Sequence, residues 1–261
     1  MKSPIRVPFV AAATLVLVAV GATWYLGAAR ADDTHAQAPA QTQNLTLDGQ
    51  PPTTMDEFLT AVTKDVDDYW TGVFEQNGIA EPRVTYAWIP AGQTATSACG
   101  DDGGTLGDSA AAYCPGDDTI YISEQFASDV MNGTLDQSLP GSAHGYGGTY
   151  GDFAVAYIVA HEYGHQIQDE LGLYETYGAQ LPTSAFELQA DCYAGTWANH
   201  AYTSNELDDG DVQEAIDAAL AVGDFDASNP QHHGTPEQRA DAWNTGFEAG
   251  DPGACSQYLN A

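Results

Sequence analysis

The feature that most constrains this chain is a His-Glu-x-x-His motif, His161-Glu-Tyr-Gly-His165. On an α-helix, residues four apart lie about 40° apart in projection, so both imidazoles can converge on one metal ion. Glu162 is rotated by about 100° from His161, so it can reach a water on that metal without being a ligand. The motif therefore predicts a site for one Zn²⁺ ion, with His161 and His165 as ligands and Glu162 as the catalytic base.

The residues before the motif predict that it lies on a helix. The segment 152–160 is apolar after its first residue and contains neither Pro nor Gly. Asp152 is a suitable N-cap and Gly172 a suitable stop, so we predict a helix of about five turns over 152–171. The alternative is a buried helix whose two His are satisfied by carbonyl groups. The acidic residues further along the chain argue against that alternative.

A second helix is expected to supply the third metal ligand. Glu187 and Asp191 lie four residues apart in the segment 181–197, a short loop after the first helix. Glu187 is predicted to bind the metal, and Asp191 to accept the N–H of a ligating His, which fixes the tautomer of that imidazole. The alternative is local, because Ser184 and Glu187 also match a capping box. Since two His need a third protein ligand, we favour the metal role for Glu187.

Two further His residues are weaker candidates. His233 precedes a strong helix start, with Thr235 as the expected N-cap, Pro236 at the first helical position and Gln238 as the partner in a capping box. A His outside the ligand set can donate to a developing oxyanion, so His233 is a second catalytic candidate. A His that caps or bridges helices is the alternative. His144 lies in the Gly-rich stretch 141–148, where we expect a surface loop rather than the wall of a cleft.

Charge restricts the partners of the chain. It has 37 acidic and 6 basic residues, and a formal net charge of −31. All the acidic residues follow residue 31, whereas Lys2, Arg6 and Arg30 precede it. Such a field excludes nucleic acid as an expected partner and repels anionic membrane surfaces.

The N-terminus predicts export. The run 7–29 contains no charged residue and is long enough to span a hydrocarbon core of about 30 Å. Lys2 and Arg6 before it favour an N-in, single-pass orientation, and Trp24 and Tyr25 suit the outer interface. We therefore expect 1–31 to anchor the chain in the cell membrane.

A cleaved signal peptide is the alternative for this segment, because Ala29-Arg30-Ala31 matches an A-x-A cleavage site. The protein would then be secreted. Residues 32–52 are rich in Ala, Gln, Thr and Pro and read as a flexible tether. In both cases the domain 53–261 is expected outside the cytoplasm.

The four cysteines suggest two disulfides, because their number is even and the chain carries an export signal. Three pairings are possible. We favour Cys99 with Cys114, which closes a short Gly-rich loop, and Cys192 with Cys255, which ties a helix to the C-terminal tail.

Periodicity and turn signals predict the remaining elements. A helix is expected to start at a capping box of Thr54 and Glu57 and to end at Asn77-Gly78. The other expected elements are strands at 84–89 and 119–123 and helices at 124–131 and 211–222. The Gly- and Asp-rich segment 99–118 is expected to be a solvated loop rather than a calcium site, although it contains Asp101, Asp102, Asp117 and Asp118.

Several stretches together resemble the bacterial family called putative neutral zinc metallopeptidases. The resemblance covers 83–258, and its motifs are Ala98-Cys-Gly, Tyr113 to Ile122, Gly151-Asp-Phe-Ala, His161 to Gln168, Glu187 to Trp197 and His233 to Arg239. It implies a zincin-like α+β domain with a small antiparallel or mixed sheet and several helices, behind one N-terminal transmembrane helix. It also implies metal binding by His161 and His165 and catalysis by Glu162. Glu187-Leu-Gln-Ala-Asp191 resembles the third-ligand motif of heat-shock-type membrane peptidases. Gln166 departs from the family, which often has a second His there.

The sequence thus predicts an extracytoplasmic zinc peptidase that acts on peptides or proteins. One alternative is a non-catalytic envelope binding protein that keeps zinc for stability, although such a site has no need of Glu162. Another is a zinc amidase of the cell wall, because the same metal and Glu162 serve either amide. The sequence does not indicate an oligomeric state.

Overall fold

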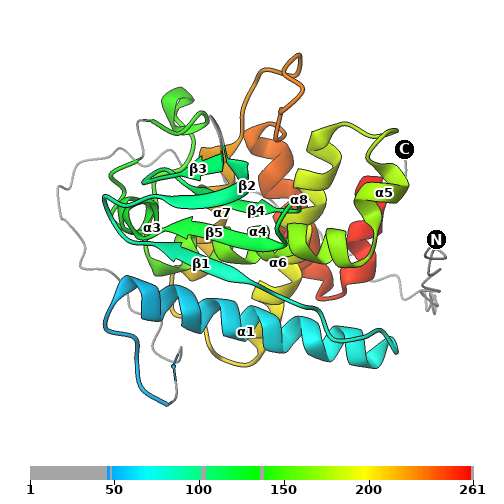
Figure 1. Ribbon diagram of the computed structural model, residues 1–261, viewed down its shortest axis with the longest axis horizontal. Coiled ribbons are helices and arrows are strands. Elements are labelled where there is room, and N and C mark those ends of the chain that lie inside the picture. Colours follow the sequence, from blue (N-terminus) through cyan, green and yellow to red (C-terminus); the bar gives the residue numbers. More distant parts are fainter. Residues whose placement is uncertain (1–45, 48, 101–103, 136–137, 260–261) are drawn as a thin grey trace, which may run out of the picture. The chain divides into compact units, whose positions relative to one another are not determined.

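The two central helices are α4 (Asp152–Glu170) and α6 (Thr183–Thr203), which pack against each other (Figure 1). Helix α4 buries residues on every side, including Phe153, Val155, Tyr157 and Val159. It packs against α1, α3, α6, α7 and two strands, so it forms the centre of the hydrophobic core. A helix that is apolar nearly all round is buried in this way.

The computed structural model describes residues 46–47, 49–100, 104–135 and 138–259, all within the compact unit Pro39–Ala261. The predicted membrane segment 7–29 lies outside these residues, as does most of the predicted tether 32–52. Within the described ranges, no helix is long and apolar enough to cross a membrane. The expected transmembrane helix over 7–29 therefore stays a prediction.

A three-stranded mixed sheet covers one side of α4. Its order is β1 (Tyr86–Ile89), β5 (Thr119–Ser123) and β4 (Ala111–Cys114), with β1 parallel and β4 antiparallel to β5. A second sheet pairs β2 (Ala95–Gly100) with β3 (Thr105–Leu106). All five residues of β5 are buried, because β5 has a neighbour on each side and α4 beneath it.

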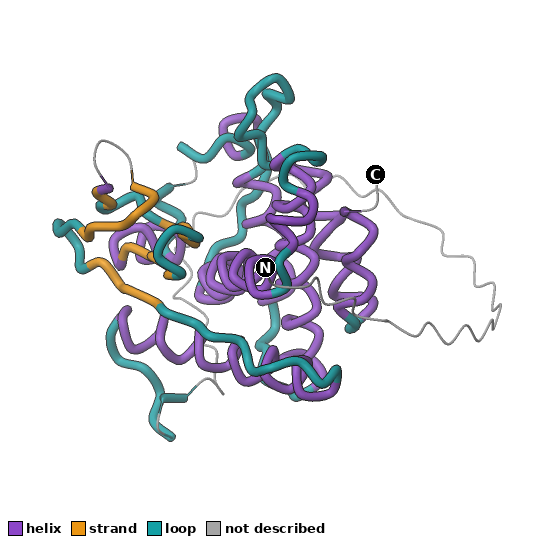
Figure 2. Tube along the Cα trace, turned by 45° about the vertical axis from the view of Figure 1, so that its right-hand side comes forward, coloured by secondary structure: helices purple, strands orange, loops and turns teal. Residues whose placement is uncertain are grey.

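The other helices surround this centre. Figure 2 shows the strands gathered at one side and most, but not all, of the helices toward the other. Helix α1 runs alongside β1 in both views, and Trp88 Nε1 donates to Thr60 Oγ1 between them over 2.8 Å. The remaining elements are α1 (Met55–Gln76), α3 (Glu124–Met131), α5 (Leu173–Tyr177), α7 (Asp211–Val222), α8 (Pro236–Ala249) and the 3₁₀ segments η1 (Ser142–His144) and η2 (Pro252–Leu259). The predicted α+β class with a small mixed sheet is confirmed.

One sequence prediction of the fold is wrong. Segment 99–118 is not a solvated loop, because it contains β3 and β4, and β4 joins the main sheet. Asp117 also has a structural role: its Oδ2 accepts from Ala98 N–H over 2.8 Å and from Tyr121 O–H over 3.0 Å. Four strand residues between Gly- and Asp-rich turns are too few to show a period of two.

Two predicted helix caps are also wrong. Asp152 is the first helical residue, and Gly151 occupies the N-cap position. Thr54 makes no side-chain cap, because the Glu57 carboxylate instead accepts from the N–H and O–H of Thr53, each over 2.8 Å. The predicted capping box of Thr235 and Gln238 is confirmed.

Both predicted disulfides are present. Cys99–Cys114 joins β2 to β4, and Cys192–Cys255 joins α6 to η2. The described part of the chain has no free cysteine. The second disulfide begins one residue after Asp191, so it fixes the helix that carries the predicted third ligand.

Candidate metal centre

Three side chains from α4 and α6 converge in the core. His161, His165 and Glu187 each offer one ligand atom, and these atoms all lie within 4.8 Å of one another. Glu187 faces both rings: its Oε2 is 3.3 Å from His161 Nε2 and its Oε1 is 3.5 Å from His165 Nε2. All three side chains are buried. The structure therefore brings together the three residues that the sequence proposed as ligands.

Close packing of the two helices makes this convergence possible. A Cβ atom at Gly164 would lie 3.1 Å from both Cα and the carbonyl oxygen of Ala190 on α6. Gly164 stands between the two His of the motif, so α6 approaches α4 at the level of the site. The Ser184–Glu187 capping box is absent, because α6 begins at Thr183 with Pro182 as N-cap and no side-chain cap. Glu187 is therefore free for the metal.

Each His is oriented through its other ring nitrogen. His161 Nδ1 is 2.8 Å from Asp191 Oδ1, as the sequence predicted. His165 Nδ1 is 2.9 Å from Gln168 Oε1 and 3.1 Å from the hydroxyl of Tyr174. Because a carboxylate and an amide oxygen can only accept, we infer that both Nδ1 atoms carry hydrogen. In this tautomer the Nε2 atom of each imidazole, which faces Glu187, would be the atom that binds a metal.

A buried arginine supports Asp191. Arg239 donates to Asp191 through Nε over 2.8 Å and through Nη2 over 2.9 Å. Tyr157, one helical turn before His161, donates to Asp191 Oδ1 over 2.6 Å. Arg239 Nη2 is almost equally far from the two nitrogens of His161, at 3.3 and 3.4 Å. An atom that lay along the Nε2 lone pair would be much closer to Nε2 than to Nδ1, so the guanidinium does not lie in that direction. The arginine therefore does not block the metal position.

The charges of these groups set their protonation in the absence of a metal. Burial is the largest single influence on the pKa of His161 and lowers it, but the charge and hydrogen bond of Asp191 and the hydrogen bond of Glu187 together raise that pKa to about 9. Burial likewise lowers the pKa of His165, but the charge and hydrogen bond of Glu187 and the charge of Glu162 together raise it. Burial raises the pKa of Glu187, but the two imidazoles hold it well below its usual range. A metal that binds here must displace protons from the imidazoles.

Glu162 lies beside the ligands but is not one of them. It is buried, and its Oε2 accepts from the backbone N–H of Tyr113 on β4 over 2.8 Å. The residue after His161 on a helix points away from the shared face of His161 and His165, as the rotation of about 100° requires. The backbone of β4 thus holds one carboxylate oxygen of Glu162 beside the metal site.

The donor set fits zinc. Two imidazole nitrogens and one carboxylate oxygen are the ligands of catalytic zinc sites, which keep a fourth position for water or substrate. The hydrogen bonds to both Nδ1 atoms are the contacts that such imidazoles usually make. Hard cations such as Mg²⁺ and Ca²⁺ prefer oxygen ligands, so the two His disfavour them.

His233 and His144 lie apart from this cluster. His233 is exposed; its backbone N–H donates to Asp224 Oδ2 over 2.9 Å and its Nδ1 is 3.6 Å from the same oxygen. Within the described residues, no hydrogen bond or ion pair joins it to the three ligands. His144 lies in η1 on the surface, where its Nδ1 is 2.9 Å from Pro140 O. The catalytic role of His233 stays a prediction that this geometry does not favour.

The sequence did not identify Arg239, Tyr157, Gln168 or Tyr174 as parts of the site. One signal pointed to Arg239, which is the only Lys or Arg after residue 83 in a chain with 37 acidic residues. A lone cation in such a chain is expected to have a specific carboxylate partner. No local signal marks Tyr157, because an aromatic residue in a buried helix is ordinarily core.

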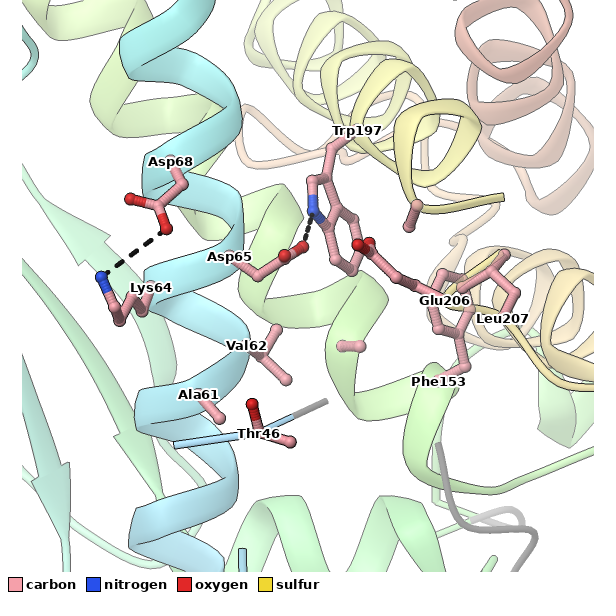
Figure 3. A pocket seen from close by; sticks show the side chains of 12 residues that line it. Thr46, Ala61, Val62, Lys64, Asp65, Asp68, Phe153, Trp197, Glu206 and Leu207 are labelled. Atoms are coloured by element: carbon pink, nitrogen blue, oxygen red, sulfur yellow. Dashed lines mark hydrogen bonds and ion pairs between the residues drawn. The ribbon is translucent and has the colours of Figure 1, made fainter. Parts of the chain in front are cut away.

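A cavity lies apart from this cluster. It has a volume of about 230 Å³ and is lined by residues of α1, α4, α6 and the segment that follows α6, among them Asp65, Asp68 and Glu206 (Figure 3). Trp197 Nε1 donates to Asp65 Oδ2 across it over 2.7 Å. None of the three candidate ligands lines this cavity. The chemistry of the donor atoms, rather than cavity size, therefore identifies the functional site.

The fold and the site define an α+β protein with a buried His₂Glu centre of the zinc-binding kind. The family model described as putative neutral zinc metallopeptidase matches residues 9–258. The chain therefore belongs to the putative neutral zinc metallopeptidase family.

Two curated relatives match this chain over similar lengths. "Uncharacterized protein YpfJ" of Escherichia coli strain K12 is 31% identical over 224 residues, which cover 77% of this chain and 71% of that protein. "Uncharacterized protein Rv2575" of Mycobacterium tuberculosis strain H37Rv is 33% identical over 227 residues, which cover 78% of this chain and 70% of that protein. No solved structure matches the chain.

Proposed function

We propose that this protein is a zinc-dependent peptidase that hydrolyses peptide bonds with Glu162 as its general base. The observation that carries the proposal is the buried carboxylate of Glu162, which lies next to the His₂Glu cluster without joining it and is held by Tyr113 N–H. A site that only stabilised the fold would not require a buried acid in that position.

His161, His165 and Glu187 would hold the ion, and Asp191 and Gln168 would fix the orientation of the two imidazoles. A bound zinc ion supplies Lewis acidity to the scissile carbonyl and to the attacking water. Glu162 accepts the proton of that water and delivers it to the leaving amine. The hydrogen bond from Tyr113 N–H keeps one Glu162 oxygen in place, while the other oxygen accepts the proton and delivers it.

The sheet suggests where a peptide would lie. Strand β5 cannot accept a substrate strand, because β1 and β4 occupy both its sides. Strand β4 is an edge of the main sheet, and it is the strand whose Tyr113 contacts Glu162. An extended peptide paired with the outer edge of β4 would bring its backbone past Glu162. The edge strand β1 is the alternative, but the residue that contacts Glu162 lies on β4.

We also propose that the protein acts outside the cytoplasm. Support comes from the uncharged run 7–29 behind Lys2 and Arg6, and from two disulfides, which persist in oxidising compartments. The run would either anchor the chain in the cell membrane or be removed, leaving a secreted protein. Added protease should then digest the domain on intact cells if it is anchored. Protection from that protease, with the protein retained inside cells, would contradict an extracytoplasmic location.

The peptidase proposal is tested by incubating the zinc-loaded protein with a library of peptides derived from denatured proteins. We expect new peptide termini by mass spectrometry, and their loss after zinc is removed by a chelator. Cleavage of cell-wall peptides alone would favour the zinc amidase instead. A protein that binds one zinc ion per chain yet cleaves neither substrate would be a non-catalytic zinc module.

A further inference from the structure

A second cluster of buried acidic residues lies where α7 meets the start of α4. Asp152, Asp211 and Glu214 each offer one oxygen, and these atoms lie within 4.8 Å of one another. The three residues are only 6%, 0% and 4% exposed. Asp152 precedes His161 by nine residues on the same helix, about 13 Å along its axis, so this cluster is separate from the zinc centre.

Backbone groups hold two of these carboxylates in place. Glu214 Oε2 accepts from Phe153 N–H, the second residue of α4, over 3.1 Å. Asp211 Oδ2 accepts from Asp208 N–H over 2.8 Å. A Cβ atom at Gly151 would lie 2.3 Å from Glu214 Oε1, so only glycine allows the carboxylate to lie this close to the chain. The side chains are therefore positioned by the fold.

Asp211 also has an oxygen that the protein does not satisfy. Its Oδ1 is buried and has no hydrogen-bond partner in the described part of the structure. A buried carboxylate oxygen without a partner carries the unfavourable desolvation cost of a charged group. Such an oxygen beside two other carboxylates is suited to bind a cation.

Within the described ranges, no Lys or Arg forms an ion pair with Asp211 or Glu214. The Lys and Arg residues of the described ranges form their ion pairs elsewhere, Lys64 with Asp68, Arg83 with Glu170 and Arg239 with Asp191.

Burial raises the pKa of Asp211 to about 7, and the charges of Asp152 and Glu214 act in the same direction. Three carboxylates this close cannot all stay ionised alone. They need either shared protons or a bound cation.

We propose that Asp152, Asp211 and Glu214 form a calcium site that fastens the start of α4 to α7. The donor atoms of these three side chains are all oxygens, as Ca²⁺ requires, and none is a nitrogen or sulfur that would favour zinc. Ca²⁺ accepts mixed monodentate and bidentate carboxylates, and water can complete its shell. Mg²⁺ demands a nearly ideal octahedron at shorter distances, so it fits such a set less well.

This role is independent of the proposed peptidase activity, because the ion would act on the stability of the helix that carries His161 and His165. The site would give the folded protein an affinity for calcium that the unfolded chain lacks. Calcium should therefore raise the melting temperature by mass action.

The test compares the full-length protein with Asp211→Asn and Glu214→Gln, all zinc-loaded and dialysed free of calcium. Asp209→Asn is the matched control, because Asp209 is exposed and lies two residues from Asp211. Calcium at about 100 times its dissociation constant should raise the melting temperature of the wild type and of Asp209→Asn by about 5–10 °C. Isothermal titration with CaCl₂ should show one site per chain.

Both cluster variants should lose the calcium response. They should remain folded without calcium, because each removes one of three mutually repelling charges. MgCl₂ at the same concentration should shift the wild type much less. If calcium shifts the wild type no more than it shifts Asp211→Asn, the cluster shares protons and the proposal is wrong. The same holds if titration detects no calcium binding to the wild type.

Discussion

At the scale of single residues, the site depends on a buried chain of contacts from Arg239 through Asp191 to His161. Asp191 is fully buried, which raises the pKa of its carboxyl, but the charges and hydrogen bonds of Arg239 and His161 together lower that pKa to about 2. An ionised carboxylate in the core is tolerable only because a guanidinium, a hydroxyl and an imidazole all donate to it. Removal of one donor should therefore affect both stability and metal binding.

We expect Arg239→Met to lower the free energy of unfolding by about 3–5 kcal/mol, because it leaves the Asp191 charge buried and unpaired. Zinc affinity should fall about 10–100-fold, because Asp191 then no longer holds His161 firmly. Arg83→Met is the control: Arg83 pairs with Glu170 on the surface, where an ion pair contributes only about 0–1 kcal/mol. Urea unfolding and zinc competition titration measure both quantities. Equal losses in the two variants would contradict the role given to Arg239.

Zinc affinity should also depend on pH. The pKa of His161 is raised to about 9 in the metal-free protein, and that of His165 is raised as well. Zinc competes with these protons, so its apparent affinity should rise as pH increases toward 9 and fall as the imidazoles become protonated. Competition titrations with a chromophoric chelator between pH 6 and 9 measure this. An affinity that is flat over this range would contradict protonated imidazoles in the metal-free site.

The sequence could predict the ligands but not their support. His161, Glu162 and His165 belong to one short motif, and Glu187 and Asp191 belong to another. Helical spacing alone therefore relates the residues within each motif. Arg239 lies 48 residues from Asp191 in sequence, and only tertiary packing makes them partners. The same holds for Tyr113, 49 residues before Glu162.

At the scale of elements, α6 is fixed by glycines that allow close approach of its neighbours. A Cβ atom at Gly246 on α8 would lie 1.9 Å from the carbonyl oxygen of Cys192 on α6. A Cβ atom at Gly195 would lie 2.1 Å from Trp243 O in the same interface. This close packing of α8 against α6 brings Arg239 within hydrogen-bonding distance of Asp191.

We expect Gly246→Ala to destabilise the protein by about 1–3 kcal/mol, as overpacking usually does, and to weaken zinc binding through the displaced Arg239. Gly72→Ala on α1 is the matched control, because a Cβ atom there meets nothing within 4 Å. That change should stabilise the protein by about 0.5–1 kcal/mol, since alanine favours the helix. Thermal and urea unfolding compare the two. A neutral Gly246→Ala would show that α8 can shift without cost.

The helices that the sequence predicted best are those with a long repeating pattern of apolar residues. Helices with many apolar residues at helical spacing, such as α1 and α4, were found with ends within one or two residues. Strand β4 was missed, because Ala111-Ala-Tyr-Cys114 is short and follows a Gly- and Asp-rich segment. Its place is decided by pairing with β5, which no local pattern reveals.

At the scale of the whole molecule, two disulfides restrict the unfolded chain to different extents. Cys192–Cys255 spans 63 residues and Cys99–Cys114 spans 15. Loop-closure entropy then predicts contributions of roughly 4 and roughly 3 kcal/mol.

The double variant Cys192→Ala/Cys255→Ala should therefore lose more stability than Cys99→Ala/Cys114→Ala in urea unfolding. It should also lose zinc affinity, because Cys192 follows Asp191 directly. A larger loss from the shorter loop would contradict this account.

The central claim is that Glu162 is the catalytic base of a zinc peptidase, and Glu162→Gln tests it most directly. Glutamine keeps the size of the side chain and its acceptor for Tyr113 N–H, but it cannot take a proton. Zinc content should stay at one ion per chain and the melting temperature should hardly change, because no ligand is lost. The rate of peptide hydrolysis should fall by about 10²–10⁴-fold. A zinc-loaded Glu162→Gln protein as active as the wild type would contradict the proposed mechanism.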